Sequence, residues 1–187
     1  MTEGPDHPST IAMLEAWKRM ECAPADGLLA SPRADVTGDE DALVGRIFVL
    51  QKRSQHDWPF RTAGEHLASV LGRPLSGRNF LDFWSGPDRE MVRTLLQAVS
   101  SQGAPGLVRA QAETLAGRSL KIEIALAPLP SVANGSPRLL GHYQDLGEDL
   151  GLAKEPVWRH ALIGIVPPER RRPRPALRLV SRNGRLI

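Results

Sequence analysis

Residues 58–84 read WPFRTAGEHLASVLGRPLSGRNFLDFW, and this stretch decides the fold. Its first six residues predict a short strand, and Leu67, Val70 and Leu71 then recur at the spacing of a helix. A connector that contains Gly and Pro follows. An aromatic cluster closes the stretch: Phe80, Phe83 and Trp84. The stretch therefore predicts a strand that leads through short helical turns into a longer helix.

The composition is that of one globular domain with tails. The chain has 187 residues, of which 41% are hydrophobic and 24% are charged. Cys22 is the only cysteine, which excludes an internal disulfide and fits a reducing compartment. Since no apolar run approaches the roughly 18 residues of a membrane span, we expect a cytoplasmic protein.

The charge is distributed unevenly along the chain. The net charge is +3, and residues 167–187 contribute +6 from seven arginines and Glu169. Residues 1–166 therefore carry −3. The basic character belongs to the tail and not to the part that we expect to fold.

The N-terminal segment predicts an amphipathic helix that runs from Ser9 or Thr10 to about Cys22. One apolar stripe would mark its buried face: Met13, Leu14, Trp17 and Met20. This stripe could pack on its own domain or form the interface of a homodimer, and the sequence leaves both open. Residues 23–41 show no periodicity and predict a linker.

The rest of the chain predicts five strands around a long helix. The helix begins at Ser85 and ends at Gln102, with two strands before it and three after it. The expected strands cover residues 43–51, 58–63, 107–115, 118–127 and 138–146. Pro59 cannot donate to a ladder, which places the second strand at an edge or a bulge. The pattern predicts an α+β fold with one antiparallel sheet.

This order of elements resembles the PAS sensory domains. The resemblance rests on Gly-Arg-Pro-Leu-x-Gly at 72–77 and Phe-Leu-Asp at 80–82, set between the second strand and the long helix. More narrowly, the chain resembles stand-alone bacterial PAS proteins found mainly in alphaproteobacteria. The alternative is an α+β fold of other ancestry.

The resemblance implies a five-stranded antiparallel sheet with helices on one face, an N-terminal amphipathic helix and a basic C-terminal tail. It divides the chain into a helix and linker at 1–41, the PAS domain at 42–147 and a C-terminal extension at 148–187.

In PAS domains the inner face of the sheet and the helices enclose a pocket. The resemblance implies that seven residues line it: Leu67, Leu71, Phe80, Trp84, Leu95, Ile122 and Ile124. Each of these side chains also fits an ordinary core. If the pocket is filled by its own side chains, the domain acts as a protein-interaction module.

The cofactors of known PAS proteins find little support in the sequence. A flavin photocycle needs a cysteine near the turn at 77–82, but Cys22 lies far away. The long helix lacks a histidine that could bind haem, and His66 fits a hydrogen-bonded or solvated helix residue better.

Metal binding and catalysis are not indicated either. The five histidines are scattered without metal-ligand spacing. The glycines at 72–77 lack the Lys of a phosphate-binding loop, and no catalytic constellation is present. We therefore expect a protein that is not an enzyme.

The C-terminal extension has an apolar part and a basic part. We expect residues 157–166 to dock on the domain with Trp158 as an anchor. The basic part offers candidate anion ligands: Arg170, Arg171, Arg172 and Arg174. These arginines could make the protein a receptor for an anionic nucleotide such as cyclic-di-GMP, or a weak nucleic-acid binder, or they could be a solvated tail. Nucleic acid is not the favoured partner.

Taken with the resemblance, the sequence predicts a PAS sensor or adaptor that carries out no catalysis. Such a protein would bind a small ligand or a protein partner and form a homodimer. By the family resemblance it would regulate bacterial motility, the cell cycle or transcription.

Overall fold

A six-stranded antiparallel sheet forms the centre of the computed structural model. The structure describes residues 4–22, 43–130, 135–147 and 155–169, and the backbone of 181–182 and 185–186. The strands lie in the order β2-β1-β5-β4-β3-β6. They span Ile47–Gln51 (β1), Phe60–Ala63 (β2), Gly106–Thr114 (β3), Ser119–Leu129 (β4), Arg138–Asp145 (β5) and Val157–Val166 (β6). A separate hairpin pairs β7 (Ser181–Arg182) with β8 (Arg185–Leu186).

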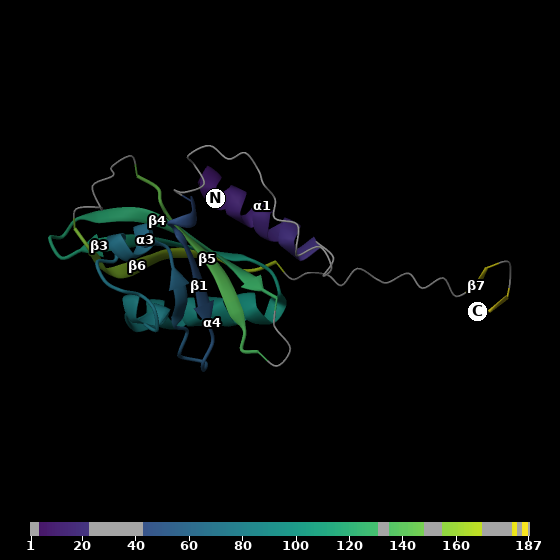
Figure 1. Cartoon of the computed structure of the whole chain (residues 1–187). Helices are drawn as coiled ribbons and strands as arrows, with labels where there is room; N and C mark the ends of the chain where they lie inside the picture. Colours follow the sequence, from purple (N-terminus) through teal and green to yellow (C-terminus); the bar gives the residue numbers. More distant parts are fainter. Residues whose placement is uncertain are drawn as a thin grey trace.

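The helices cover both faces of the sheet (Figure 1). Three of them pack on one face, here called the inner face: α3 (Glu65–Val70), the 3-10 helix η2 (Phe80–Phe83) and α4 (Gly86–Gln102). The N-terminal helix α1 (Pro8–Cys22) contacts β4 and β5 on the opposite, outer face. The predicted arrangement of helices on one face thus holds for the helices between β2 and β3, while α1 covers the other side.

The residues at the two ends of the long helix α4 explain where this helix begins and ends. Ser85 precedes it with an extended backbone, and Pro87 lies in the first turn, where its missing N–H costs nothing. Gly103 ends the helix in the left-handed conformation, with φ 66°, and its N–H donates to the Val99 carbonyl. The buried face carries Val92, Leu95, Leu96 and Val99. The helix predicted from Ser85 to Gln102 is therefore confirmed.

The expected count of five strands is wrong by one. The additional strand is β6, which pairs with β3 from Leu107 opposite Val166 to Thr114 opposite Val157. Without β6, β3 would leave a nine-residue edge unpaired, and an apolar segment is available to cover it. The register shifts twice along this pair, between Arg109 and Ala110 and between Glu113 and Thr114. These irregularities break the two-residue period by which a strand is recognised.

The middle of the sheet is closely packed around Phe48, the aromatic residue of β1. A Cβ placed on Gly141 of β5 would lie 2.1 Å from the Phe48 ring of β1, so only glycine fits there. The Phe48 ring in turn stacks against Phe80 of η2 at 5.7 Å. At the far side, β2 is an edge strand, as Pro59 predicted. The core therefore lies between the sheet and η2, where the pocket was expected.

Candidate functional site

The seven predicted pocket residues come together in one apolar core on the inner face. All are at most 4% exposed: Leu67, Leu71, Phe80, Trp84, Leu95, Ile122 and Ile124. Leu67 lies in α3, and Leu71 follows this helix directly. Phe80 lies in η2, and Trp84 follows it directly. Leu95 belongs to α4, and Ile122 and Ile124 belong to β4. This cluster is here called the inner core. Its residues fit both the lining of a ligand site and an ordinary core, so their role as ligand contacts stays a prediction.

Aromatic rings make up one side of the inner core. Phe60 contacts Phe48, Phe80 and Phe83 with ring centroids 5.4–6.2 Å apart. Phe80 also contacts Trp84 at 6.1 Å. The edge-to-face and tilted arrangements are those that aromatic pairs prefer, and they join β2 to η2.

A polar pair lies within this apolar region. The Tyr143 hydroxyl of β5 lies 2.9 Å from Nε2 of His160 on β6, and the contact is buried. The His160 ring also stacks on Trp84 at 5.1 Å and meets the edge of Phe83 at 6.0 Å. His160 therefore connects β6 with both the sheet and η2. Sequence reasoning placed neither His160 nor Tyr143 in the site.

Burial changes the ionisation of both members of the pair. Burial lowers the pKa of His160 from 6.5 to about 4; the nearby Phe83 carbonyl partly offsets this effect, and the charge of Arg73 adds to it. Burial also raises the pKa of Tyr143, with a smaller contribution from the Asp145 carboxylate. At neutral pH the pair is uncharged. The tautomer of the neutral His160 ring decides which of the two groups donates in this hydrogen bond.

Three buried N–H or ring nitrogen atoms of this region have no hydrogen-bond partner among the described residues. They are Nε1 of Trp58, Nε1 of Trp84 and Nδ1 of His160. The Phe83 carbonyl influences His160 electrostatically, but its geometry falls short of a hydrogen bond. An unsatisfied buried polar atom costs about 1–3 kcal/mol, so such atoms in a native core call for water or a ligand.

Three contacts attach β6 to the helical side of the domain. The Asp88 carboxylate in the first turn of α4 accepts a hydrogen bond of 2.9 Å from the Leu162 amide. The Arg73 guanidinium, which lies over the Phe83 ring at 4.7 Å, donates to the Trp158 carbonyl of β6 at 3.5 Å. A Cβ on Gly72, which has a φ of 61°, would meet Pro156 at 2.2 Å. The segment 157–166 therefore docks on the domain as expected, but Trp158 is 43% exposed and is not the anchor. Instead, Val157 and His160 are buried.

The helix α1 is held on the outer face by its apolar stripe. Met13 and Trp17 are each 2% exposed, and the Trp17 indole donates to the Pro128 carbonyl over 2.7 Å. Leu14 is half-buried, while Met20 is 54% exposed. Two of the four residues predicted for a dimer interface are thus buried against the same chain. The homodimer itself stays a prediction.

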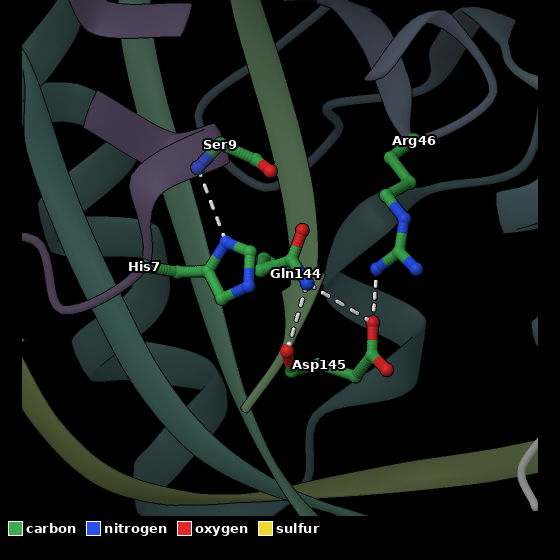
Figure 2. A network of polar contacts seen from close by, with 5 residues as sticks. All are labelled: His7, Ser9, Arg46, Gln144 and Asp145. Carbon is green, nitrogen blue, oxygen red and sulfur yellow. Dashed lines mark hydrogen bonds and ion pairs between the residues drawn. The ribbon is translucent and has the colours of Figure 1, made fainter. Parts of the chain in front are cut away.

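Two networks of charged residues connect segments that are far apart in the sequence. Before α1, Arg109 of β3 pairs with Asp6 at 3.0 Å, and the Asp6 amide donates to the buried Glu123 carboxylate of β4. Figure 2 shows a second network, in which Arg46 pairs with Asp145 and the Gln144 amide donates to the Asp145 carboxylate.

Two further histidines, His142 and His66, differ in environment. His142 of β5 is fully buried, both of its ring nitrogens lack a partner in the described chain, and burial lowers its pKa to about 4. His66 on α3 is half-buried, and burial and the Arg46 charge lower its pKa. Asp145 raises it in part. His66 thus belongs to the surroundings of the Arg46–Asp145 pair, and no iron-binding role follows from its position.

Three further expectations from the sequence concern an anion site, metal binding and membrane-spanning helices. The four arginines of the predicted anion site, Arg170, Arg171, Arg172 and Arg174, lie outside the described residues. Within the described ranges, no three His, Cys, Asp or Glu side chains are grouped as a metal site would require. Among the helices that the structure describes, none is long and apolar enough to cross a membrane.

Comparisons with known proteins agree with this architecture. The family model described as "PAS domain" matches residues 5–144. No curated protein matches the chain.

Several solved structures of light-oxygen-voltage (LOV) and PAS domains are similar. A fungal LOV photoreceptor is 16% identical, with 74% of this chain and 94% of that chain covered and a TM-score of 0.47. The Rhodobacter sphaeroides LOV protein is 13% identical, with 61% and 71% covered and a TM-score of 0.45. The PAS domain of Bordetella pertussis BvgS is 17% identical, with 60% and 84% covered and a TM-score of 0.41.

The family model spans well over half of the chain, and it takes in α1 together with five strands of the sheet. The chain belongs to the PAS domain family.

Proposed function

We propose that this protein is a PAS sensor that binds a small molecule in its inner core and carries out no catalysis. The observation that supports the proposal is that Nε1 of Trp84 and Nδ1 of His160, next to the Tyr143 hydroxyl, have no hydrogen-bond partner among the described residues. A ligand with a hydrogen-bond acceptor beside Nε1 of Trp84 would satisfy one of these atoms, and a flat ligand would suit the rings around it.

The same pair offers a route from ligand to output. A ligand that contacts His160 in the inner core would favour one position of β6, because a ligand shifts an equilibrium by its different affinity for two states. Since β6 is one of the two edge strands of the sheet, such a change would reach the surface and the tail that follows.

The finer parts of the proposal rest on the family resemblance. We propose a cytoplasmic bacterial protein that forms a homodimer and acts on a protein partner in motility, the cell cycle or transcription. The exposed Met20, on the same side of α1 as the buried Met13, is the candidate contact for a second copy.

The test is a comparison of native and denatured mass spectra of the purified full-length chain. The proposal expects a mass excess in the native spectrum that disappears on denaturation. A native mass equal to that of the bare chain, as monomer or as dimer, would contradict ligand binding and leave the protein-interaction module as the better account.

A further inference from the structure

A second site lies on the surface, at the end of the sheet where β1 leaves and β2 begins. An open pocket of about 230 Å³ is present there. Its lining includes Gln51, Arg53, Phe60, Arg61, Ser76 and Gly77. It is formed by the strand ends and the connector after α3, and it shares only Phe60 with the inner core.

The walls of this pocket are held by backbone hydrogen bonds. The Gly77 amide donates to the Phe60 carbonyl at 2.8 Å, and the Phe60 amide donates to the Arg78 carbonyl at 2.9 Å. Gly77 has a φ of 78°, a conformation that favours glycine, and it turns the connector back along β2. The walls of the pocket are therefore formed by main-chain segments that are hydrogen-bonded to each other.

Its arginines lack acidic partners. The Arg53 guanidinium has no partner among the described residues, and Arg61 donates only to the Gln51 side-chain oxygen, at 3.2 Å. Arg78, next to Gly77, donates only to the Pro74 carbonyl. The connecting loop 52–59 contains one acidic residue, Asp57. Two arginines, Arg53 and Arg61, therefore line one concave surface without an acidic partner among the described residues.

The other arginines of the described residues fall into two groups: some pair with a carboxylate, while others, such as Arg73, Arg118 and Arg138, do not. Five arginines face a carboxylate: Arg46 with Asp145, Arg89 with Asp82, Arg93 with Glu90, Arg109 with Asp6 and Arg159 with Glu113. Residues 1–166 carry a net charge of −3, so carboxylates are not scarce. Neighbouring cations repel one another. Arginines without an acidic partner in an acidic domain are therefore expected where an anion binds.

The size and charge of the pocket identify the kind of anion. Pockets that enclose a whole small molecule measure roughly 300–1,000 Å³, so this one suits a single head group. Guanidinium forks bind phosphate oxygens in pairs, and two or three of them match a doubly charged phosphate better than one carboxylate. We propose that Arg53 and Arg61, with Ser76 beside them, bind the phosphate group of a small phosphate monoester. This site does not depend on ligand binding in the inner core.

The test is a titration of the ¹⁵N-labelled full chain with inorganic phosphate and with glycerol 3-phosphate, followed by amide chemical shifts at constant ionic strength. We expect the amides of Arg53, Ser76 and Gly77 to shift along a saturating curve with either probe. The double variant R53Q/R61Q should weaken binding about tenfold or more, because both guanidinium groups proposed to donate to the phosphate are lost. The control R118Q changes an exposed arginine on the β3–β4 hairpin and should bind like the wild type.

Three results would overturn the proposal. The first is a set of shifts confined to the basic tail after residue 169, which would mean that the tail alone binds anions. The second is equal binding by R53Q/R61Q and wild type. The third is equal affinity for acetate, which would exclude selection for phosphate. Because both substituted arginines are exposed, loss of folding does not confuse the comparison.

Discussion

The Tyr143 hydroxyl lies 2.9 Å from Nε2 of His160, although β4 and β3 separate their strands in the sheet. The two side chains meet over the inner face, where β3 carries the small residues Ala110 and Ala112. Larger residues at these positions would fill the space that the pair occupies. One hydrogen bond thus connects the body of the domain to the strand at its edge.

Replacing Tyr143 with Phe tests the strength of this connection. The variant Tyr143→Phe keeps the ring but leaves Nε2 of His160 buried without a partner. We expect the free energy of unfolding to fall by about 1–3 kcal/mol in urea titrations. The control Leu115→Ala alters a side chain that is 80% exposed and should stay within about 0.5 kcal/mol of wild type. Equal stability of Tyr143→Phe and wild type would show that the bond contributes nothing.

The two buried histidines predict a loss of stability in acid. His142 and His160 both have a pKa of about 4 in the folded protein, lowered by burial from 6.5. Between these two values the unfolded chain binds more protons than the folded chain, so stability falls as the pH falls from 6.5 to 4. Each histidine contributes a slope of up to about 1.4 kcal/mol per pH unit.

The measurement is the unfolding free energy at several pH values for wild type and for His160→Leu. The variant should show a shallower slope between pH 6.5 and 4, since one titrating group is gone. Above pH 7 both histidines are neutral in the folded and the unfolded chain, so they predict no dependence of stability on pH. An unchanged slope in the variant would mean that His160 is protonated equally in both states.

The hydrogen bond from Leu162 to Asp88 predicts local opening of β6. In Asp88→Ala the Leu162 amide loses its acceptor. Because a hydrogen bond to a carboxylate contributes about 1.5–3 kcal/mol, we expect the hydrogen exchange of this amide to become roughly tenfold to a hundredfold faster. Amides at the centre of α4, such as that of Val99, should keep their rates. The control Asp82→Ala removes an exposed pairing with Arg89 and should leave Leu162 unchanged. Uniform acceleration across the domain would indicate global destabilisation instead.

A pair of glycine substitutions tests the packing of the sheet. In Gly141→Ala the new methyl group would overlap the Phe48 ring, so we expect a loss of about 1–3 kcal/mol, measured by thermal or urea unfolding. Gly164→Ala is the matched control, because a Cβ at that strand position meets nothing within 4 Å. Similar stability of the two variants would contradict the tight contact between β5 and β1.

Much of the fold could be predicted because its elements have regular periods. The alternation of Ile122 and Ile124 with polar neighbours identified β4, and the spacing of Leu95 and Val99 identified α4. The apolar residues that these periods assign to the interior are buried, while their contact with a ligand stays a prediction. The edge position of β2 followed from Pro59.

The sixth strand and its histidine could not be found in this way. β6 carries an extra residue at Ile163 and another at Trp158, where its register with β3 shifts, so its buried positions do not alternate. Sequence alone also favours Trp158 over His160 as the buried residue, since histidine is less often buried than large apolar residues. His160 is buried by contacts with residues far away in the sequence, Tyr143, Trp84 and Phe83, and no local pattern reports such contacts.

The most direct test of the account compares hydrogen exchange in β6 before and after removal of small molecules. Protein as purified is measured beside the same protein that has been unfolded, dialysed and refolded. The account predicts faster exchange at residues 157–166 in the refolded sample, because His160 has lost its ligand contact, with unchanged rates in α1. Identical exchange in β6 in the two samples would contradict a ligand-bound core that controls this strand.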